Sequence, residues 1–77
     1  MERLADFFRA LANERRLIIW IRLHEQGSAC VLELAHELGI SETATTKHLK
    51  KLAQAGVIEQ TRVGEYVLSS SKETLLS

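Results

Sequence analysis

Hydrophobic residues recur at helical spacing through most of this chain, and the first such pattern covers residues 2–11. Four large apolar side chains take the i, i+3, i+4 and i+7 positions of one face: Leu4, Phe7, Phe8 and Leu11. The opposite face is polar, so the spacing predicts an amphipathic helix. Two phenylalanines on so short a helix pack either within their own domain or against a second subunit, and the pattern leaves both open.

A second helix is predicted between Asn13 and Gly27, around the apolar run LIIWIRL of residues 17–23. The β-branched content of this run would also fit a buried strand. We favour a helix because Asn13 is a good N-cap and Gly27 is a natural helix stop. A helix that is apolar nearly all round is expected to be the central buried helix, with Trp20 in the core, and it could touch both the core and a partner subunit.

The stretch Val31–Leu52 reads as two helices joined by a turn at Gly39. The first is expected over 31–38 and the second over 41–54, with Ser41 as its N-cap. The residues expected to face inward are Val31, Leu34, Ala35, Leu38, Thr45, Leu49 and Leu52. Two helices joined by a Gly-containing turn are typical of a helix-turn-helix, whose second helix lies in the major groove of DNA.

The opposite face of the 41–54 helix is polar and partly cationic. It carries Glu42, Thr43, Thr46, Lys47 and Lys50, with His48 and Lys51 on its flanks. Hydroxyl groups can reach base edges while ammonium groups contact phosphates, so this mixture suits a DNA groove. An ordinary solvated helix face has a similar composition, because lysines near a helix C-terminus complement the helix dipole. The preceding helix and turn favour the DNA-binding interpretation.

A β-hairpin is predicted directly after this helix, which is expected to stop at Gly56. Val57–Thr61 and Glu65–Ser69 read as short strands around a Gly-containing tip at residues 62–64. A hairpin in this place, residues 57–68, forms the wing of a winged helix. Arg62 near the tip could enter a minor groove or contact the DNA backbone, or it could simply be solvated.

Two shorter segments complete the pattern. Residues 29–30 are expected to form a short extended piece. The serines at 69–71 read as a polar break, and the sequence KETLL that follows could begin a short C-terminal helix capped by Ser70 or Ser71. The whole chain, 1–77, is therefore predicted to be one domain. Its fold class is mainly α with a small β-hairpin: four helices, two strands and the short last helix.

Composition narrows the functional classes. Ten basic and ten acidic residues cancel, yet residues 41–62 hold four basic residues against two acidic ones. Any DNA affinity would therefore rest on a few well-placed cations. A single cysteine rules out an intramolecular disulfide and fits a reducing cytoplasm. No apolar run approaches a membrane span and the N-terminus lacks a signal peptide, so a cytoplasmic protein without membrane contact is expected.

Three sequence fragments resemble the ArsR-type family of winged helix-turn-helix repressors. ALANERRLIIW, residues 10–20, is similar to the family's Ala-[Asp/Asn]-x-x-Arg-Leu segment. The recognition segment Ser-x-x-x-[Val/Thr]-[Ser/Thr]-x-His-Leu-x-x-Leu matches Ser41, Thr45, Thr46, His48, Leu49 and Leu52. The approach to the wing, Ala-Gly-[Leu/Val]-[Ile/Val], matches Ala55, Gly56, Val57 and Ile58. Together the fragments span about residues 4–68.

The resemblance implies a homodimer that represses transcription by binding double-stranded DNA at an inverted-repeat operator. Carried over by position, the DNA contacts would be Thr43, Thr46, Lys47, His48, Lys50 and Arg62. Members of the family usually dimerise through their first and last helices. The interface expected here lies on the first helix: Leu4, Phe7, Phe8 and Leu11.

One departure from the family pattern concerns its metal sensors. Many members carry Cys-x-Cys at the start of the third helix, and here Cys30 is followed by Leu32 at the second position. One thiolate does not build a tetrahedral metal site, and only His24 or His36 could add to it. No metal and no cofactor is therefore predicted. Cys30 is interpreted as a small apolar residue, with a redox switch as the alternative.

The sequence bears on two other functional classes. A winged-helix module that binds proteins instead of DNA fits the neutral net charge and the presence of Glu42 and Glu65 near the proposed surface. An enzyme does not fit. The chain shows no paired carboxylates, no nucleophile beside a base and no Gly-rich phosphate loop, and its three histidines lie on separate elements.

Overall fold

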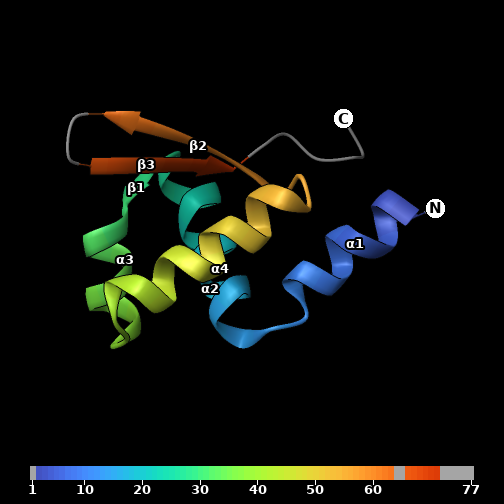
Figure 1. Ribbon diagram of the computed structural model, residues 1–77, viewed down its shortest axis with the longest axis horizontal. Helices are drawn as coiled ribbons and strands as arrows, with labels where there is room; N and C mark the ends of the chain where they lie inside the picture. Colours follow the sequence, from blue (N-terminus) through green and yellow to red (C-terminus); the bar gives the residue numbers. More distant parts are fainter. Residues whose placement is uncertain (1, 64–65, 72–77) are drawn as a thin grey trace.

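The computed structural model describes residues 2–63 and 66–71. Its elements, labelled in Figure 1, follow the order α1 (Glu2–Leu11), α2 (Glu14–Gln26), β1 (Ala29–Cys30), α3 (Val31–Leu38), α4 (Glu42–Gln54), β2 (Ile58–Val63) and β3 (Tyr66–Ser71). The strands lie across one side of the helices, and α1 extends away at one end (Figure 1). This arrangement is a winged helix-turn-helix and confirms the predicted fold class.

Helix α2 begins and ends where local chemistry predicts. The Asn13 side chain accepts a hydrogen bond from the Arg16 backbone N–H at 3.2 Å. At the other end, Gly27 has φ 86°, and its N–H donates to the Leu23 carbonyl at 2.7 Å. A positive φ is easy for glycine and strained for other residues, which explains why the helix stops there.

Within the described chain only one face of α2 is buried, and contact of its other face with a partner stays a prediction. Ile19 and Leu23 are fully buried, whereas the opposite face stays about two-fifths exposed at three apolar positions: Leu17, Ile18 and Ile21. The other elements of this small domain cover one side of the helix only. Trp20 lies between these faces and is half-buried against the core.

The helix-turn-helix forms as predicted. Helix α3 ends at Gly39, which adopts the left-handed conformation with φ 67°. The Ile40 N–H then donates to the Ala35 carbonyl at 3.2 Å, which closes the turn. The Ser41 hydroxyl caps α4 by accepting from the Ala44 N–H at 3.0 Å.

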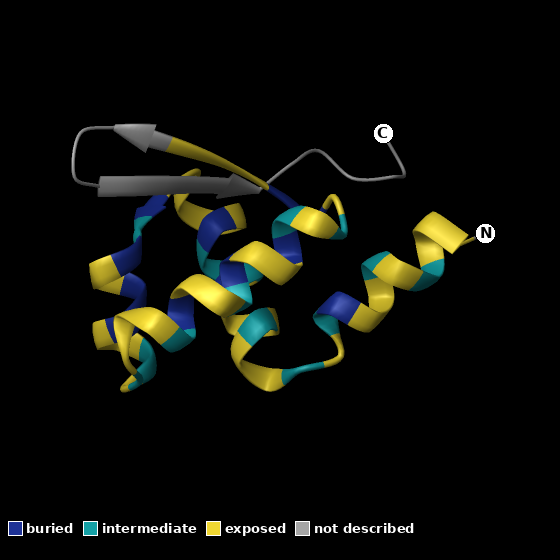
Figure 2. Cartoon of the chain, in the orientation of Figure 1, coloured by how far each residue is buried: buried dark blue, intermediate teal, exposed yellow. Residues whose placement is uncertain are grey.

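The core lies between the helix-turn-helix, α2 and the start of the wing. Its fully buried members include Ile19 and Leu23 from α2 and Leu49 and Leu52 from α4. Leu34 from α3 is almost fully buried. Figure 2 marks buried stretches, in dark blue, on each of these helices. Both helices of the helix-turn-helix thus share one apolar core with α2.

The sheet is larger than the predicted hairpin. Its strand order is β1-β3-β2, antiparallel throughout, and the pairing continues to Val63 opposite Tyr66. Arg62 was predicted to lie in the loop at the tip of the hairpin. In the structure it belongs to β2. Residues 64–65 lie outside the described part of the chain.

The predicted polar break at residues 69–71 is also wrong, because these serines belong to β3. Ser69 pairs with Gln60 on one side and with Ala29 of β1 on the other, so the strand is held along both edges there. Serines 70 and 71 pair with β2. The predicted C-terminal helix falls at residues 72–77, which lie outside the described residues. No helix in the described ranges is long and apolar enough to cross a membrane.

Candidate nucleic-acid interface

The outward face of α4 carries four of the predicted contact residues. Thr43, Thr46, Lys47 and Lys50 are all exposed. Figure 2 shows this exposed band running along the near side of α4. Because the opposite side of the helix is buried, these side chains are presented to solvent together.

Three buried side chains hold α4 in this orientation. Leu49 and Leu52 are fully excluded from solvent in the core. Thr45, also fully buried, donates its hydroxyl to the Ser41 carbonyl at 2.9 Å, so its polar atom is satisfied inside the helix. The outward face is therefore anchored from beneath by packing that does not involve the exposed residues.

His48 differs from the four exposed residues. It is half-buried, and its Nδ1 accepts a hydrogen bond from the Arg16 Nε at 3.3 Å. Burial lowers the pKa of His48 below its usual 6.5, and the positive charges of Arg16, Arg15 and Lys51 lower it further. The imidazole is therefore neutral near pH 7, with Nδ1 taken by Arg16.

Arg16 is a residue that the sequence analysis did not assign. Its Nε bonds His48 and its Nη1 donates to the Ala10 carbonyl at 3.4 Å, so one guanidinium joins α1, α2 and α4. Arg16 is the arginine of the quoted Ala-[Asp/Asn]-x-x-Arg-Leu segment, and His48 is the histidine of the recognition segment. Membership of both residues in these segments is the sequence signal that could have pointed to Arg16. The structure brings the two side chains together across 32 positions.

Electrostatics favour an anionic partner for α4. Lys47, Lys50 and Lys51 form no ion pair with any residue of the described ranges, and neither does Arg15. Arg9 is paired with Asp6 at 2.9 Å and Arg22 with Glu37 at 3.1 Å. Three lysines that are unpaired in the described ranges thus lie on α4, and Arg15 is near enough to His48 to lower the pKa of that histidine.

The predicted apolar face of α1 is divided in the structure. Phe7 and Leu11 pack against the core, whereas Phe8 is 61% and Leu4 39% exposed. The Phe7 and Phe8 rings meet edge to face with centroids 5.6 Å apart. The first two residues support packing within the domain, and the last two remain available to a second subunit.

The wing contributes a backbone position for the remaining predicted residue. Arg62 stands opposite Val67 in the β2–β3 ladder, one residue before the end of β2. Its side chain lies outside what the structure describes, so its contact with DNA stays a prediction.

Comparison with known proteins agrees with this geometry. The family described as winged helix-turn-helix DNA-binding matches residues 13–59. The arsenic resistance transcriptional regulator ArsR1 from Pseudomonas putida is 33% identical over 60 residues, which cover 78% of this chain and 47% of that protein. The chain belongs to the ArsR-type winged helix-turn-helix family. This is a family of DNA-binding regulators and not of enzymes.

Solved structures of ArsR-type and related proteins share the fold. HlyU from Vibrio cholerae has a TM-score of 0.86 at 29% identity, over 95% of this chain and 76% of that one. The homodimeric winged helix-turn-helix DNA-binding domain Mb0332 from Mycobacterium bovis has a TM-score of 0.83 at 31% identity, over 91% and 64%. The chain spans about half the length of ArsR1, 47%.

Among ArsR-type proteins, this chain lacks the paired cysteines of the metal sensors. Cys30 is a free, half-buried thiol at the end of β1, and Leu32 in α3 is 51% exposed. No group of three or more His, Cys, Asp or Glu side chains able to hold a metal ion occurs in the described residues. A single thiol is too few donors for a tetrahedral site.

Proposed function

We propose that this ArsR-type protein is a sequence-specific DNA-binding transcriptional regulator that represses by occupying an inverted-repeat operator. The observation that carries the proposal is the outward face of α4, where exposed Thr43, Thr46, Lys47 and Lys50 stand together on a helix anchored from beneath. The threonines and lysines read bases and contact phosphates in the major groove, and the β2–β3 wing adds Arg62 at the adjacent groove or backbone.

His48 belongs to this surface in a limited way. Its Nδ1 is already bonded to Arg16, so only the other ring nitrogen is left to contact DNA. In the proposed complex His48 sets the position of α4 relative to α2, and any DNA contact it makes is a donated hydrogen bond from Nε2.

The proposed regulator acts as a homodimer in the cytoplasm. Leu4 and Phe8 are exposed on α1, the helix through which ArsR-type proteins usually pair, and Mb0332 with the same fold is homodimeric. Two copies related by a twofold axis read two half-sites about one helical turn apart. Phe7 and Leu11 support this face from within the domain.

Selection of bound sites from random double-stranded DNA tests the proposal, followed by affinity measurements at two salt concentrations. A regulator enriches a palindromic sequence, and its affinity falls steeply as salt rises because phosphate contacts release counterions. Failure to enrich any sequence would favour the alternative, a winged-helix module that binds proteins. The neutral net charge of the chain is the observation on its side.

A further inference from the structure

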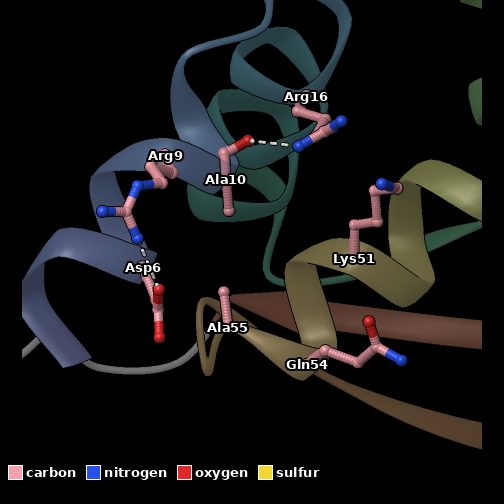
Figure 3. Close-up of a pocket in the computed structure, with 7 residues that line it drawn as sticks. All are labelled: Asp6, Arg9, Ala10, Arg16, Lys51, Gln54 and Ala55. Carbon is pink, nitrogen blue, oxygen red and sulfur yellow. Dashed lines mark hydrogen bonds and ion pairs between the residues drawn. The ribbon is translucent and has the colours of Figure 1, made fainter. Parts of the chain in front are cut away.

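A cleft opens beside α4, on the flank next to its outward face. It lies where the C-terminal half of α1, the first turn of α2 and the end of α4 meet, and it has a volume of about 290 Å³. Figure 3 shows its lining, which includes Asp6, Arg9, Ala10, Arg16, Lys51 and Gln54. From the sequence, Lys51 was placed on the flank of the 41–54 helix, but these residues were not expected to meet in one cleft.

The cleft carries an excess of positive charge. Three of its lining side chains are cations, and its carboxylate, Asp6, is already paired with Arg9 at 2.9 Å. The charges of Arg16 and Lys51 therefore have no anionic partner in the described residues. The lowered pKa of the adjacent His48, caused in part by both cations, reflects the same positive potential.

Two neutral acceptors orient Arg16 in this cleft. Its Nε bonds the His48 ring and its Nη1 bonds the Ala10 carbonyl, and neither partner neutralises the guanidinium. Its Nη2 has no partner in the described ranges. Ordering the side chain before a ligand arrives reduces the entropy lost on binding, so Arg16 is prepared to donate to an oxyanion.

Lys51 supplies a second donor from the facing element. Figure 3 shows its side chain rising from α4 toward the end of the cleft where Arg16 lies. A fixed guanidinium and a mobile ammonium are the two groups that proteins use to hold phosphate oxygens. The Gln54 amide at the rim can donate a third hydrogen bond. The cleft, at about 290 Å³, is large enough to admit a phosphate group.

We propose that this cleft binds a phosphate group between Arg16 and Lys51. The phosphate can come from a DNA backbone or from a free phosphate-bearing molecule. The DNA source rests on the proposed function, and one feature favours it. Lys51 is four residues from Lys47, so the two lie on neighbouring turns of α4 and the cleft continues the outward face. In that case Arg16 and Lys51 extend the phosphate contacts of α4 toward α1.

The first arm of the test uses inorganic phosphate and the whole chain. Backbone and side-chain NMR signals are followed during titration with phosphate at constant ionic strength, with chloride as the reference salt. The proposal predicts saturable shifts of the Arg16 Nε and Gln54 signals. The apparent affinity for phosphate obtained from these shifts should be about tenfold lower in Lys51→Gln. The matched control Lys50→Gln removes the same charge one residue away, outside the cleft lining, and should titrate like the parent.

The second arm measures DNA affinity against salt for Lys51→Gln and for Arg3→Gln, which removes an exposed charge from α1 outside the cleft. If the cleft takes a backbone phosphate, Lys51→Gln lowers the salt slope by about 1 on every duplex sequence, and Arg3→Gln does not. If the phosphate is free, DNA binding is unchanged and only the first arm responds.

The two arms separate failure of this proposal from failure of the proposed function. If the parent protein binds no DNA but shows saturable phosphate shifts at Arg16, the proposed DNA binding is refuted and the proposed phosphate site is supported. A parent that binds DNA, with no phosphate shifts and an unchanged Lys51→Gln slope, refutes the cleft and keeps DNA binding. Equal phosphate responses in Lys50→Gln and Lys51→Gln would also overturn the proposed phosphate site. The effect would then come from the loss of any nearby positive charge and not from the cleft.

Discussion

Helix α4 has a buried face and an exposed face that we propose binds DNA, and the substitution Leu49→Ala should separate their roles. The Leu49 side chain is fully buried in the core with Ile19, Leu23 and Leu52. Truncating a buried leucine removes its transfer free energy and leaves a cavity, at a cost of about 2–5 kcal/mol. We expect about 3 kcal/mol here, because the tightly packed helices around the site cannot collapse fully into the space.

A loss of this size is large for so small a domain. With 77 residues, the chain is expected to have a free energy of unfolding of about 4–12 kcal/mol. At about 4–8 °C for each kcal/mol, Leu49→Ala should lower the melting temperature by about 12–24 °C. Urea unfolding can be followed through the fluorescence of Trp20, the single tryptophan. All variants are compared at one protein concentration, because dimer formation would add to the apparent stability.

Thr46→Ala is the matched control, because it lies on the exposed side of the same helix. It should change the free energy of unfolding by no more than about 0.5 kcal/mol. At temperatures where both variants are folded, Leu49→Ala should retain DNA affinity while Thr46→Ala weakens it. A cost below about 1 kcal/mol for Leu49→Ala, or equal costs for the two variants, would refute the assignment of the faces of α4.

Three further predictions follow from single contacts. Asn13→Ala removes the cap of α2 and should lower the free energy of unfolding by about 1 kcal/mol in thermal melts, whereas no loss would mean that the cap is replaced by water. The lowered pKa of His48 means that the unfolded chain takes up a proton first, so stability should fall as the pH drops from 6.5 toward the folded-state pKa. Urea melts of His48→Gln across this range should show a shallower fall, and an equal fall would place the effect elsewhere. Phe8→Ser should shift a dimer toward monomer in sedimentation runs without loss of helix content, and an unchanged dimer would exclude the exposed face of α1 as the interface.

Local signals explain why the helices could be predicted from the sequence. Asn13 and Ser41 cap α2 and α4 through residues three positions away, and Gly39 ends α3 by its own backbone conformation. Such signals are complete within a short window of sequence. The apolar periodicity added the buried faces of α3 and α4, including Thr45, because one side of each helix is covered.

The errors arose where distant segments decide the outcome. The serines at 69–71 are polar and carry no strand pattern. Ser69 nevertheless pairs with both β1 and β2, and the next two serines pair with β2. How much of α2 is buried depends on how many other elements the fold places around it. The composition of the helix does not show that number. Arg16 and His48 meet across 32 positions, and the cleft beside them needs α1, α2 and α4 together.

The most direct test of the central claim, that the outward face of α4 binds DNA, is the salt dependence of the double variant Lys47→Ala, Lys50→Ala on the selected operator. Both side chains are exposed and unpaired in the described residues, so the variant should unfold like the parent. Losing two phosphate contacts should reduce the slope of log affinity against log salt by about 2 and weaken binding at low salt. An unchanged slope and affinity would show that DNA, if bound, meets a different surface.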